Sequence, residues 1–207
     1  MTAAAGASAI GLMFAPSRRR IDVDVARTIT ASLSPSGPLV VGVFVNAGPE
    51  ELLSTQEAAG LDVIQLSGDE PTDITAQLAG ARVWKALRFP VGTRVETARR
   101  MIEPWLERSN AVEAVLIDAA VAGAYGGTGH RADWQLIGTL AEEYPLVLAG
   151  GLDPRNVAGA IDQVRPTGVD VSSGVEMSGQ KNAALIEEFV KAAHEAFRRR
   201  RTLNASS

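Results

Sequence analysis

Short apolar segments alternate with stretches of helical periodicity along the whole chain. The apolar segments are rich in Val, Ile and Leu without polar alternation, which is typical of strands covered on both faces of a parallel sheet. The expected strands are Ile10–Phe14, Leu39–Val45, Asp62–Leu66, Val83–Leu87, Ala114–Ile117, Pro145–Ala149 and Gly168–Val171. The expected helices are Val23–Leu33, Pro49–Ala59, Thr72–Leu78, Arg94–Glu107, Trp134–Glu143, Asn156–Val164 and Ala183–Arg199.

This alternation of strands and helices predicts an α/β fold with right-handed crossovers. A doubly wound sheet would be expected to carry one dominant Gly-rich turn after its first strand. Here glycines and polar residues follow several strands, as in FVNAGP, QLSGDE, LAGGLDP and DVSSGVE. A (βα)8 TIM barrel builds its site from such loops, so we expect this fold class, with seven strands found instead of eight. No linker divides the chain, which predicts one domain over residues 1–207.

The composition limits the classes of function. The chain has 207 residues, of which 46% are hydrophobic and 21% charged, enough for a folded core. Its net charge of −4 argues against a nucleic-acid partner. The absence of cysteine excludes disulfides, thiolate metal sites and thiol catalysis within this chain. No apolar run reaches the roughly 18 residues of a membrane span, and no secretory signal is present, so we expect a cytoplasmic protein.

Two loops are candidates for an anion site. Gly150 and Gly151 end one expected strand, and Pro154 suits the first position of the helix that follows. Backbone N–H groups at such glycines can approach an anion closely, although turn glycines need no ligand. The next strand ends in Ser172, Ser173 and Gly174, which could equally cap a helix. Together the two loops match the phosphate site that barrels often build after their last two strands.

A carboxylate and a glycine loop stand out at the end of AVLID. Asp118 follows four apolar residues, where a charge is costly unless it is paired or used, and helix capping is the simpler alternative. Tyr125-Gly126-Gly127-Thr128-Gly129 is expected to be a mobile loop able to fold over a ligand. It lacks the lysine and spacing of a nucleotide-binding Walker loop.

The remaining candidates are arginines and histidines. Arg18, Arg19 and Arg20 form either a solvated basic turn or a site where one guanidinium holds a substrate carboxylate. The basic tail, about residues 198–207, is expected to be a frayed helix end. His130 and His194 lack metal-ligand spacing, so no metal site is expected. His194 is expected at the surface, and His130, beside the glycine loop, is a weak candidate for chemistry.

Several motifs occur in an order that resembles a known family. They are GLMFAPSRRR, VGVFVN, DVIQLSGDE, VLIDA followed by YGGTG and DW, LAGGLDPRNV and GVDVSSGVE, and they span about Gly6 to Ala193. In this order and spacing they resemble phosphoribosylanthranilate isomerase, a (βα)8 enzyme of tryptophan biosynthesis. The resemblance implies an Amadori rearrangement of N-(5′-phosphoribosyl)anthranilate, in which a general acid protonates the ribose ring oxygen and a general base removes the C2′ proton. It implies no metal or organic cofactor.

The resemblance also implies roles for individual residues. Asp118 matches the family's general acid, and Arg20 matches the arginine that holds the anthranilate carboxylate. The residues expected to bind the phosphate are Gly150, Gly151, Ser172 and Ser173. Gly127, Asp170 and Gly174 complete the expected substrate-binding set. The implied partner is therefore a small phosphorylated sugar–anthranilate, with no nucleic acid or membrane, and an oligomer is possible.

Two features depart from the family pattern. The family's first strand resembles Lys-Ile-Cys-Gly and its cysteine is the general base, whereas this chain starts about where the family's second strand starts. Ser67 stands where the family usually has histidine. Three explanations are open: a start downstream of the true one, a diverged enzyme with another base, in which case His130 is considered first, or a binding protein that lost the chemistry.

A missing first strand would leave two strand edges without their shared partner. Each unpaired buried backbone group costs on the order of 1–3 kcal/mol, so the gap between Ile10–Phe14 and Gly168–Val171 should be closed. We expect the gap to be closed in one of three ways: by direct contact between those two strands, by the segment Met1–Gly6, or by the chain of another subunit. A water-filled slot would instead make the protein unstable.

Overall fold

The computed structural model describes residues 5–78, 80–107, 112–118 and 133–204. By their contacts these residues form two compact units. The N-terminal unit comprises Gly6–Ala86 and Met101–Val115. The described part of the C-terminal unit comprises residues 87–100, 116–118 and 133–204, together with residue 5. One domain over the whole chain stays a prediction.

Seven strands form the main sheet. They are β1 (Ala9–Met13), β2 (Leu39–Phe44), β3 (Val63–Leu66), β4 (Val83–Arg88), β5 (Val112–Asp118), β6 (Leu146–Ala149) and β7 (Gly168–Val169). They follow one another in the sheet in chain order. The pairs β1–β2, β2–β3, β3–β4 and β6–β7 are parallel, as their unbroken apolar composition predicts.

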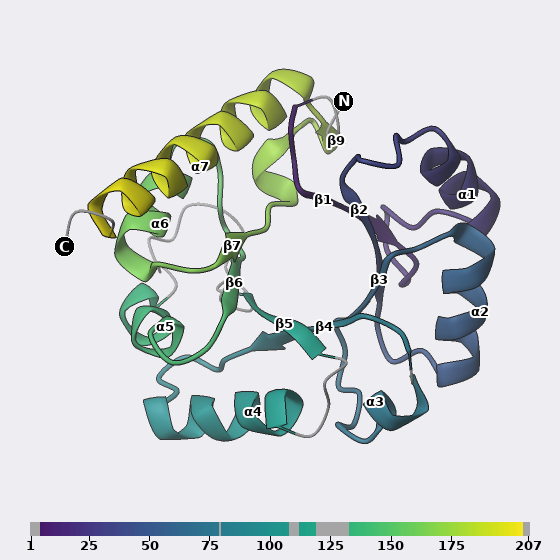
Figure 1. The fold of residues 1–207 in the computed structure, drawn as a ribbon, viewed down its shortest axis with the longest axis horizontal. Coiled ribbons are helices and arrows are strands. Elements are labelled where there is room, and N and C mark those ends of the chain that lie inside the picture. Colours follow the sequence, from purple (N-terminus) through teal and green to yellow (C-terminus); the bar gives the residue numbers. More distant parts are fainter. Residues whose placement is uncertain (1–4, 79, 108–111, 119–132, 205–207) are drawn as a thin grey trace. The chain divides into compact units, whose positions relative to one another are not determined.

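The N-terminal unit packs helices on the strands β1 to β4. Helices α1 (Val23–Ala31), α2 (Pro49–Ala59) and α3 (Ile74–Gln77) belong to it, and α4 (Val95–Glu107) reaches it with its last residues. Figure 1 shows α1 and α2 side by side outside β2 and β3. Helix α2 begins with proline at its first turn and ends at Gly60, whose φ of 66° favours glycine. Val63, Ile64 and Leu66 of β3 are fully buried, which makes this strand the centre of the unit's core.

The C-terminal unit packs three neighbouring helices outside β6 and β7. They are α5 (Trp134–Ala141), α6 (Val157–Val164) and α7 (Ala183–Asn204), with α6 in contact with both others (Figure 1). Leu148 of β6 and Ile161 of α6 are fully buried between these layers. After β7 the chain forms a short 3₁₀ helix, Ser173–Val175, and a hairpin of β8 (Glu176–Met177) and β9 (Gln180–Lys181).

The structure differs from the expected elements mainly after β7. The strand has two residues instead of four, and sequence periodicity missed the 3₁₀ helix and the hairpin because two-residue strands carry no period. The frayed end expected for the basic tail, about residues 198–207, stays a prediction. Helix α7 continues to Asn204, Arg199 Nη2 lies 3.3 Å from Asp162 Oδ2, and Arg200 donates to the Pro166 carbonyl at 3.0 Å. Arg199 thus contacts α6, and Arg200 contacts the segment between α6 and β7.

One expectation concerns a segment that the structure describes only in part. The segment Met1–Gly6 is one of those expected to close the strand gap. Its residues 1–4 lie outside the described part of the chain. How the gap is closed therefore stays a prediction. Within the described ranges, no helix combines the length and apolar character that crossing a bilayer requires.

Candidate active site

The loop after β6 has a conformation that requires its two glycines. Gly150 and Gly151 have φ values of 85° and 67°, a region that side-chain-bearing residues rarely occupy. The Asn156 side chain holds the loop, because its Nδ2 donates to Gly151 O at 2.9 Å and its Oδ1 accepts from Asp153 N at 2.9 Å. A Cβ at Gly151 would meet no atom within 4 Å, so this backbone is open on one side.

Asp153 supports the same loop through a local hydrogen-bond network. Its Oδ1 accepts from the backbone N–H groups of Arg155 at 2.7 Å and Asn156 at 3.1 Å, and its Oδ2 pairs with Arg155 Nη2 at 2.9 Å. Desolvation raises the pKa of Asp153, but the bonds from Arg155 and Asn156 outweigh it, so the pKa lies below its ordinary value. The ionised Asp153 carboxylate thus binds backbone N–H groups of the segment just before α6.

The loop after β7 lies directly against the loop after β6. The strands pair up to Asp170, whose N–H donates to Leu148 O at 2.9 Å. A Cβ at Gly174 would stand 1.8 Å from Leu152 O, so the two backbones touch and only glycine fits. The structure therefore brings together the two loops that carry Gly150, Gly151 and the Ser172–Gly174 turn.

Two carboxylates of the C-terminal unit, Asp118 and Asp170, stand at the carboxyl ends of β5 and β7. Asp118, the last residue of β5, accepts from Arg88 Nε at 3.1 Å and is partly buried. The pKa of Asp170 is raised, and desolvation is the largest cause. Part of the residue is nevertheless exposed to solvent. Lys181 opposes the rise, while the charge of Asp118 adds to it. Asp118 and Asp170 therefore lie within electrostatic reach of each other at the carboxyl ends of their strands.

The N-terminal unit holds the other two candidates, Arg20 and Ser67. Arg20 follows β1, is exposed, and forms an isolated parallel bridge with Met13. Ser67 follows β3 and accepts a hydrogen bond from Gln65 Nε2 at 3.0 Å. Both residues thus lie just beyond the carboxyl ends of their strands, where the fold predicts functional side chains.

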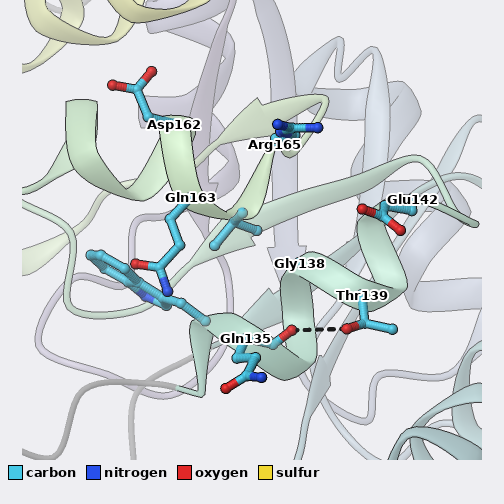
Figure 2. Close-up of a pocket in the computed structure, with 9 residues that line it drawn as sticks. Gln135, Gly138, Thr139, Glu142, Asp162, Gln163 and Arg165 are labelled. Carbon is cyan, nitrogen blue, oxygen red and sulfur yellow. Dashed lines mark hydrogen bonds between the residues drawn. The ribbon is translucent and has the colours of Figure 1, made fainter.

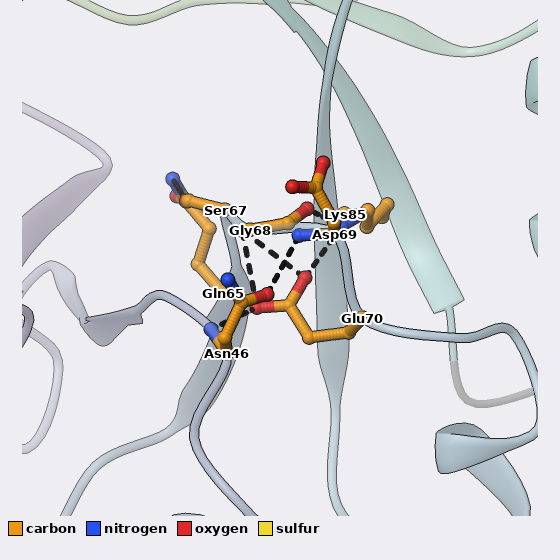
Figure 3. Close-up of polar contacts among 7 residues, drawn as sticks. All are labelled: Asn46, Gln65, Ser67, Gly68, Asp69, Glu70 and Lys85. Carbon is orange, nitrogen blue, oxygen red and sulfur yellow. Dashed lines mark hydrogen bonds and ion pairs between the residues drawn. The ribbon is translucent and has the colours of Figure 1, made fainter.

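A buried ion pair organises the segment around Ser67, and Figure 3 shows it. Lys85 Nζ lies 2.6 Å from Glu70 Oε2 and donates to Gly68 O at 2.6 Å. Glu70 also accepts from the N–H groups of Asn46 at 2.9 Å and Gly68 at 3.1 Å. The ammonium of Lys85 stands 4.8 Å from the centroid of the Trp105 ring.

Sequence reasoning singled out neither Glu70 nor Lys85. Lys85 interrupts the apolar strand VWKAL, and a lysine at a buried strand position requires a partner. That interruption was the signal available. Burial raises the pKa of Glu70, but the bonds from Lys85 and the Asn46 N–H outweigh this effect, so the pKa is below its ordinary value.

Other expected residues take no part in these clusters. Gly127 with the rest of Tyr125–Gly129, and His130, lie outside the described residues. His194 is exposed on α7, as expected. Among the described residues, no group of three or more His, Asp or Glu side chains is arranged to hold a metal ion.

A hollow of about 410 Å³ lies between α5 and α6 (Figure 2). Its lining is mostly polar and includes Trp134, Glu142, Asp162, Gln163 and Arg165. Of the expected site residues that lie in the described ranges, none borders it. It is therefore separate from the loops after β6 and β7.

Comparisons with known proteins agree with the order of the motifs. Residues 2–192 match the family described as N-(5′phosphoribosyl)anthranilate (PRA) isomerase. A relative named N-(5′-phosphoribosyl)anthranilate isomerase, from Roseiflexus sp. (strain RS-1), is 46% identical over 198 residues, covering 93% of this chain and 90% of the relative. A relative of the same name from Desulforamulus reducens is 44% identical, covering 93% of this chain and 88% of the relative.

Solved structures give the same result. The crystal structure of phosphoribosyl anthranilate isomerase from Thermotoga maritima has a TM-score of 0.81 and 38% identity, covering 94% of this chain and 91% of that one. A structure of the enzyme in complex with reduced 1-(o-carboxyphenylamino)-1-deoxyribulose 5-phosphate has a TM-score of 0.77 and 35% identity, with the same coverage. These neighbours are of the (βα)8 TIM-barrel type, which confirms the expected fold class. The chain belongs to the N-(5′-phosphoribosyl)anthranilate isomerase family.

Proposed function

We propose that this protein catalyses the isomerisation of N-(5′-phosphoribosyl)anthranilate to 1-(2-carboxyphenylamino)-1-deoxyribulose 5-phosphate in tryptophan biosynthesis. Its relatives carry the name of this activity, and a related structure holds the reduced form of the product. The observation that carries the proposal is the direct contact of the two glycine loops, after β6 and β7, with Asp118 and Asp170 at the carboxyl ends of their strands.

The substrate phosphate would bind the two loops of the C-terminal unit. The open backbone at Gly151 and the turn of Ser172, Ser173 and Gly174 supply N–H and hydroxyl donors, the groups that phosphate oxygens accept. Gly150 contributes the left-handed turn that exposes its neighbour. A phosphate there would orient the ribose toward Asp118 and Asp170.

Asp118 would act as general acid. It would donate a proton to the ribose ring oxygen as the C1′–O bond breaks, giving an open-chain iminium ion. Removal of the C2′ proton by a base then gives the neutral enolamine, which tautomerises to the ketone as the O2′ proton is lost and C1′ gains a proton. Arg20 would bind the anthranilate carboxylate, and Gly127 and Asp170 would contact the substrate.

The general base is the open point of this proposal. The family's base is a cysteine, and this chain contains none; Ser67 stands where the family usually has histidine. The departure at Ser67 favours a second candidate function, a phosphosugar-binding homologue with impaired turnover. Both candidates use the same phosphate loops, and only the first yields product.

A turnover assay with N-(5′-phosphoribosyl)anthranilate separates the two candidates, since a binding protein shows affinity without product. Asp118→Asn should lower kcat by about two to four orders of magnitude with little change in affinity for inorganic phosphate. The exposed Asp162, on α6, provides the control Asp162→Asn, which should keep kcat. Near-normal kcat in Asp118→Asn would remove Asp118 from the mechanism, and binding without turnover in the parent protein would favour the second function.

We also propose the cytoplasm as the place of action, because a charged phosphate ester does not cross a bilayer without a carrier. The only partner that the proposal requires is the small-molecule substrate. An oligomer stays a possibility that sedimentation analysis would test.

A further inference from the structure

Lys181 connects the parts of the segment that follows β7. It lies on β9, and its Nζ donates to Ser172 O at 2.6 Å while standing 3.3 Å from Glu176 Oε1. The Glu176 side chain is nearly buried, with 6% of its surface exposed, whereas 40% of the Lys181 side chain is exposed. The lysine therefore links the Ser172–Gly174 turn to the hairpin of β8 and β9.

The bond to Ser172 O sets the direction of a peptide group. A peptide unit is planar and trans, so its N–H points opposite to its C=O. With Ser172 O directed at Lys181, the N–H of Ser173 points away from the lysine. A second donor to this carbonyl, the backbone N of Val175, is 3.5 Å away, at the limit of a hydrogen bond. The short charge-assisted bond from Lys181 is therefore the stronger of the two holds on this peptide.

The surrounding backbone leaves the turn little freedom to reorganise as a whole. Gly174 is in contact with Leu152 O on one side, and Asn182 N donates to Val175 O at 3.0 Å on the other. Both anchors follow the Ser172–Ser173 peptide in the chain, and the bond from Asp170 N to Leu148 O, at 2.9 Å, precedes it. Lys181 therefore affects the orientation of the Ser172–Ser173 peptide more strongly than it affects the position of the whole turn.

We propose that Lys181 is a positioning residue, which orients the Ser172–Ser173 peptide so that the Ser173 N–H is presented to the phosphate of the substrate. This inference rests on the proposed phosphate site and deepens it. Lys181 acts through the backbone and is not itself a phosphate ligand in this role. Its charge also reaches Asp170, where it lowers the pKa of the carboxyl against desolvation and Asp118.

The test compares Lys181→Met with Lys191→Met. Lys191 is exposed on α7, so its replacement removes the same charge from the same unit without touching the turn. Calorimetric titration with inorganic phosphate measures the anion site, and amide hydrogen exchange at Ser173–Val175 in the ligand-free protein measures the turn. Lys181→Met should weaken phosphate binding by about 10- to 100-fold and speed this exchange, with an unfolding midpoint near that of Lys191→Met. Lys181→Arg, which keeps a charged N–H donor, should bind phosphate more tightly than Lys181→Met.

The outcomes distinguish this inference from the proposed function. Wild-type-like phosphate affinity and exchange in Lys181→Met would overturn the inference and leave the phosphate site standing. An equal loss of affinity in Lys191→Met would also overturn it, because net charge would then be the cause. No phosphate binding by the parent protein would contradict the phosphate site and this role together, even if exchange in Lys181→Met showed that the lysine orders the turn.

Discussion

Two loops of this protein are each held by a lysine, and they differ in how deeply that lysine is buried. After β3, Lys85 donates to Gly68 O at 2.6 Å and pairs with Glu70. After β7, Lys181 donates to Ser172 O at the same distance and pairs with Glu176. The side chains of Lys85 and Glu70 are 2% and 1% exposed, whereas 40% of Lys181 faces solvent.

This difference in burial gives the same bond different consequences. The Lys85 ammonium is shielded from water and contacts Glu70, the Gly68 carbonyl and the face of Trp105. Removing one charge of the pair therefore leaves the other buried without a counter-charge. Lys181 can return to water when its bond breaks. The first lysine is therefore coupled to the folding of its unit, and the second mainly to the geometry of one turn.

The largest expected effect comes from Lys85→Met. We expect the free energy of unfolding to fall by about 3–5 kcal/mol, because the Glu70 carboxylate stays buried without its counter-charge. Urea unfolding followed by tryptophan fluorescence measures the loss, with Lys191→Met as the control for net charge. The double variant Lys85→Met/Glu70→Gln should recover part of the loss, since it removes the stranded charge.

A loss below about 1 kcal/mol in Lys85→Met would contradict the comparison. In that case the methionine site would have to gain as much from apolar packing as the ion pair supplied. The double-variant cycle detects this, because the coupling between Lys85 and Glu70 would then be small.

The same contrast explains how much the sequence could predict. Unbroken apolar segments and helical periodicity give the strands to within a few residues and α2 at its observed bounds, because burial of a whole face leaves a pattern. The glycine loops after β6 and β7 were also predictable, since positive φ at Gly150 and Gly151 and the close approach at Gly174 require glycine.

Contacts that depend on tertiary geometry could not be predicted in the same way. Lys85 and Glu70 are 15 residues apart and meet only because β3 and β4 are neighbours. Lys181 reaches Ser172 through a hairpin of two-residue strands, which has no periodic signature. Pattern predicts which residues are buried or lie in turns, whereas the partners of individual charges follow from the fold.

A smaller effect should appear on acidification. The pKa of Glu70 in the folded protein lies below its ordinary value of 4.5, so the stability it contributes is fully present above that pH. That stability is lost as the pH falls through 4.5 toward the folded pKa, because the unfolded chain then binds the proton more readily. In Lys85→Met, the Glu70 carboxylate stays buried without its counter-charge, so the loss on acidification should shrink or turn into a gain, because protonation removes the stranded charge.

Urea midpoints between about pH 3 and pH 7 measure this shift. The Asp153 pKa is also lowered, but its partners are unchanged in Lys85→Met, so the difference between the two curves reports Glu70. Parallel curves for the parent and Lys85→Met would contradict the assignment of the shift to Lys85. Lys181→Met serves as the matched variant, since its curve should keep the Glu70-dependent loss of the parent.

The smallest effect is expected for an exposed pair in the same unit as Lys85. Arg82 Nε lies 2.7 Å from Glu113 Oε1, almost the distance of the buried pair, but the side chains are 44% and 36% exposed. Arg82→Met should therefore cost under about 1 kcal/mol, because Glu113 is solvated whether or not it is paired. Raising sodium chloride from about 0.05 M to 0.5 M should shrink this cost further, while the loss in Lys85→Met changes little, since buried charges are poorly screened. Similar losses in the two variants would show that distance, and not burial, decides the energy of these ion pairs, and the contrast between the two lysine-held loops would lose its physical basis.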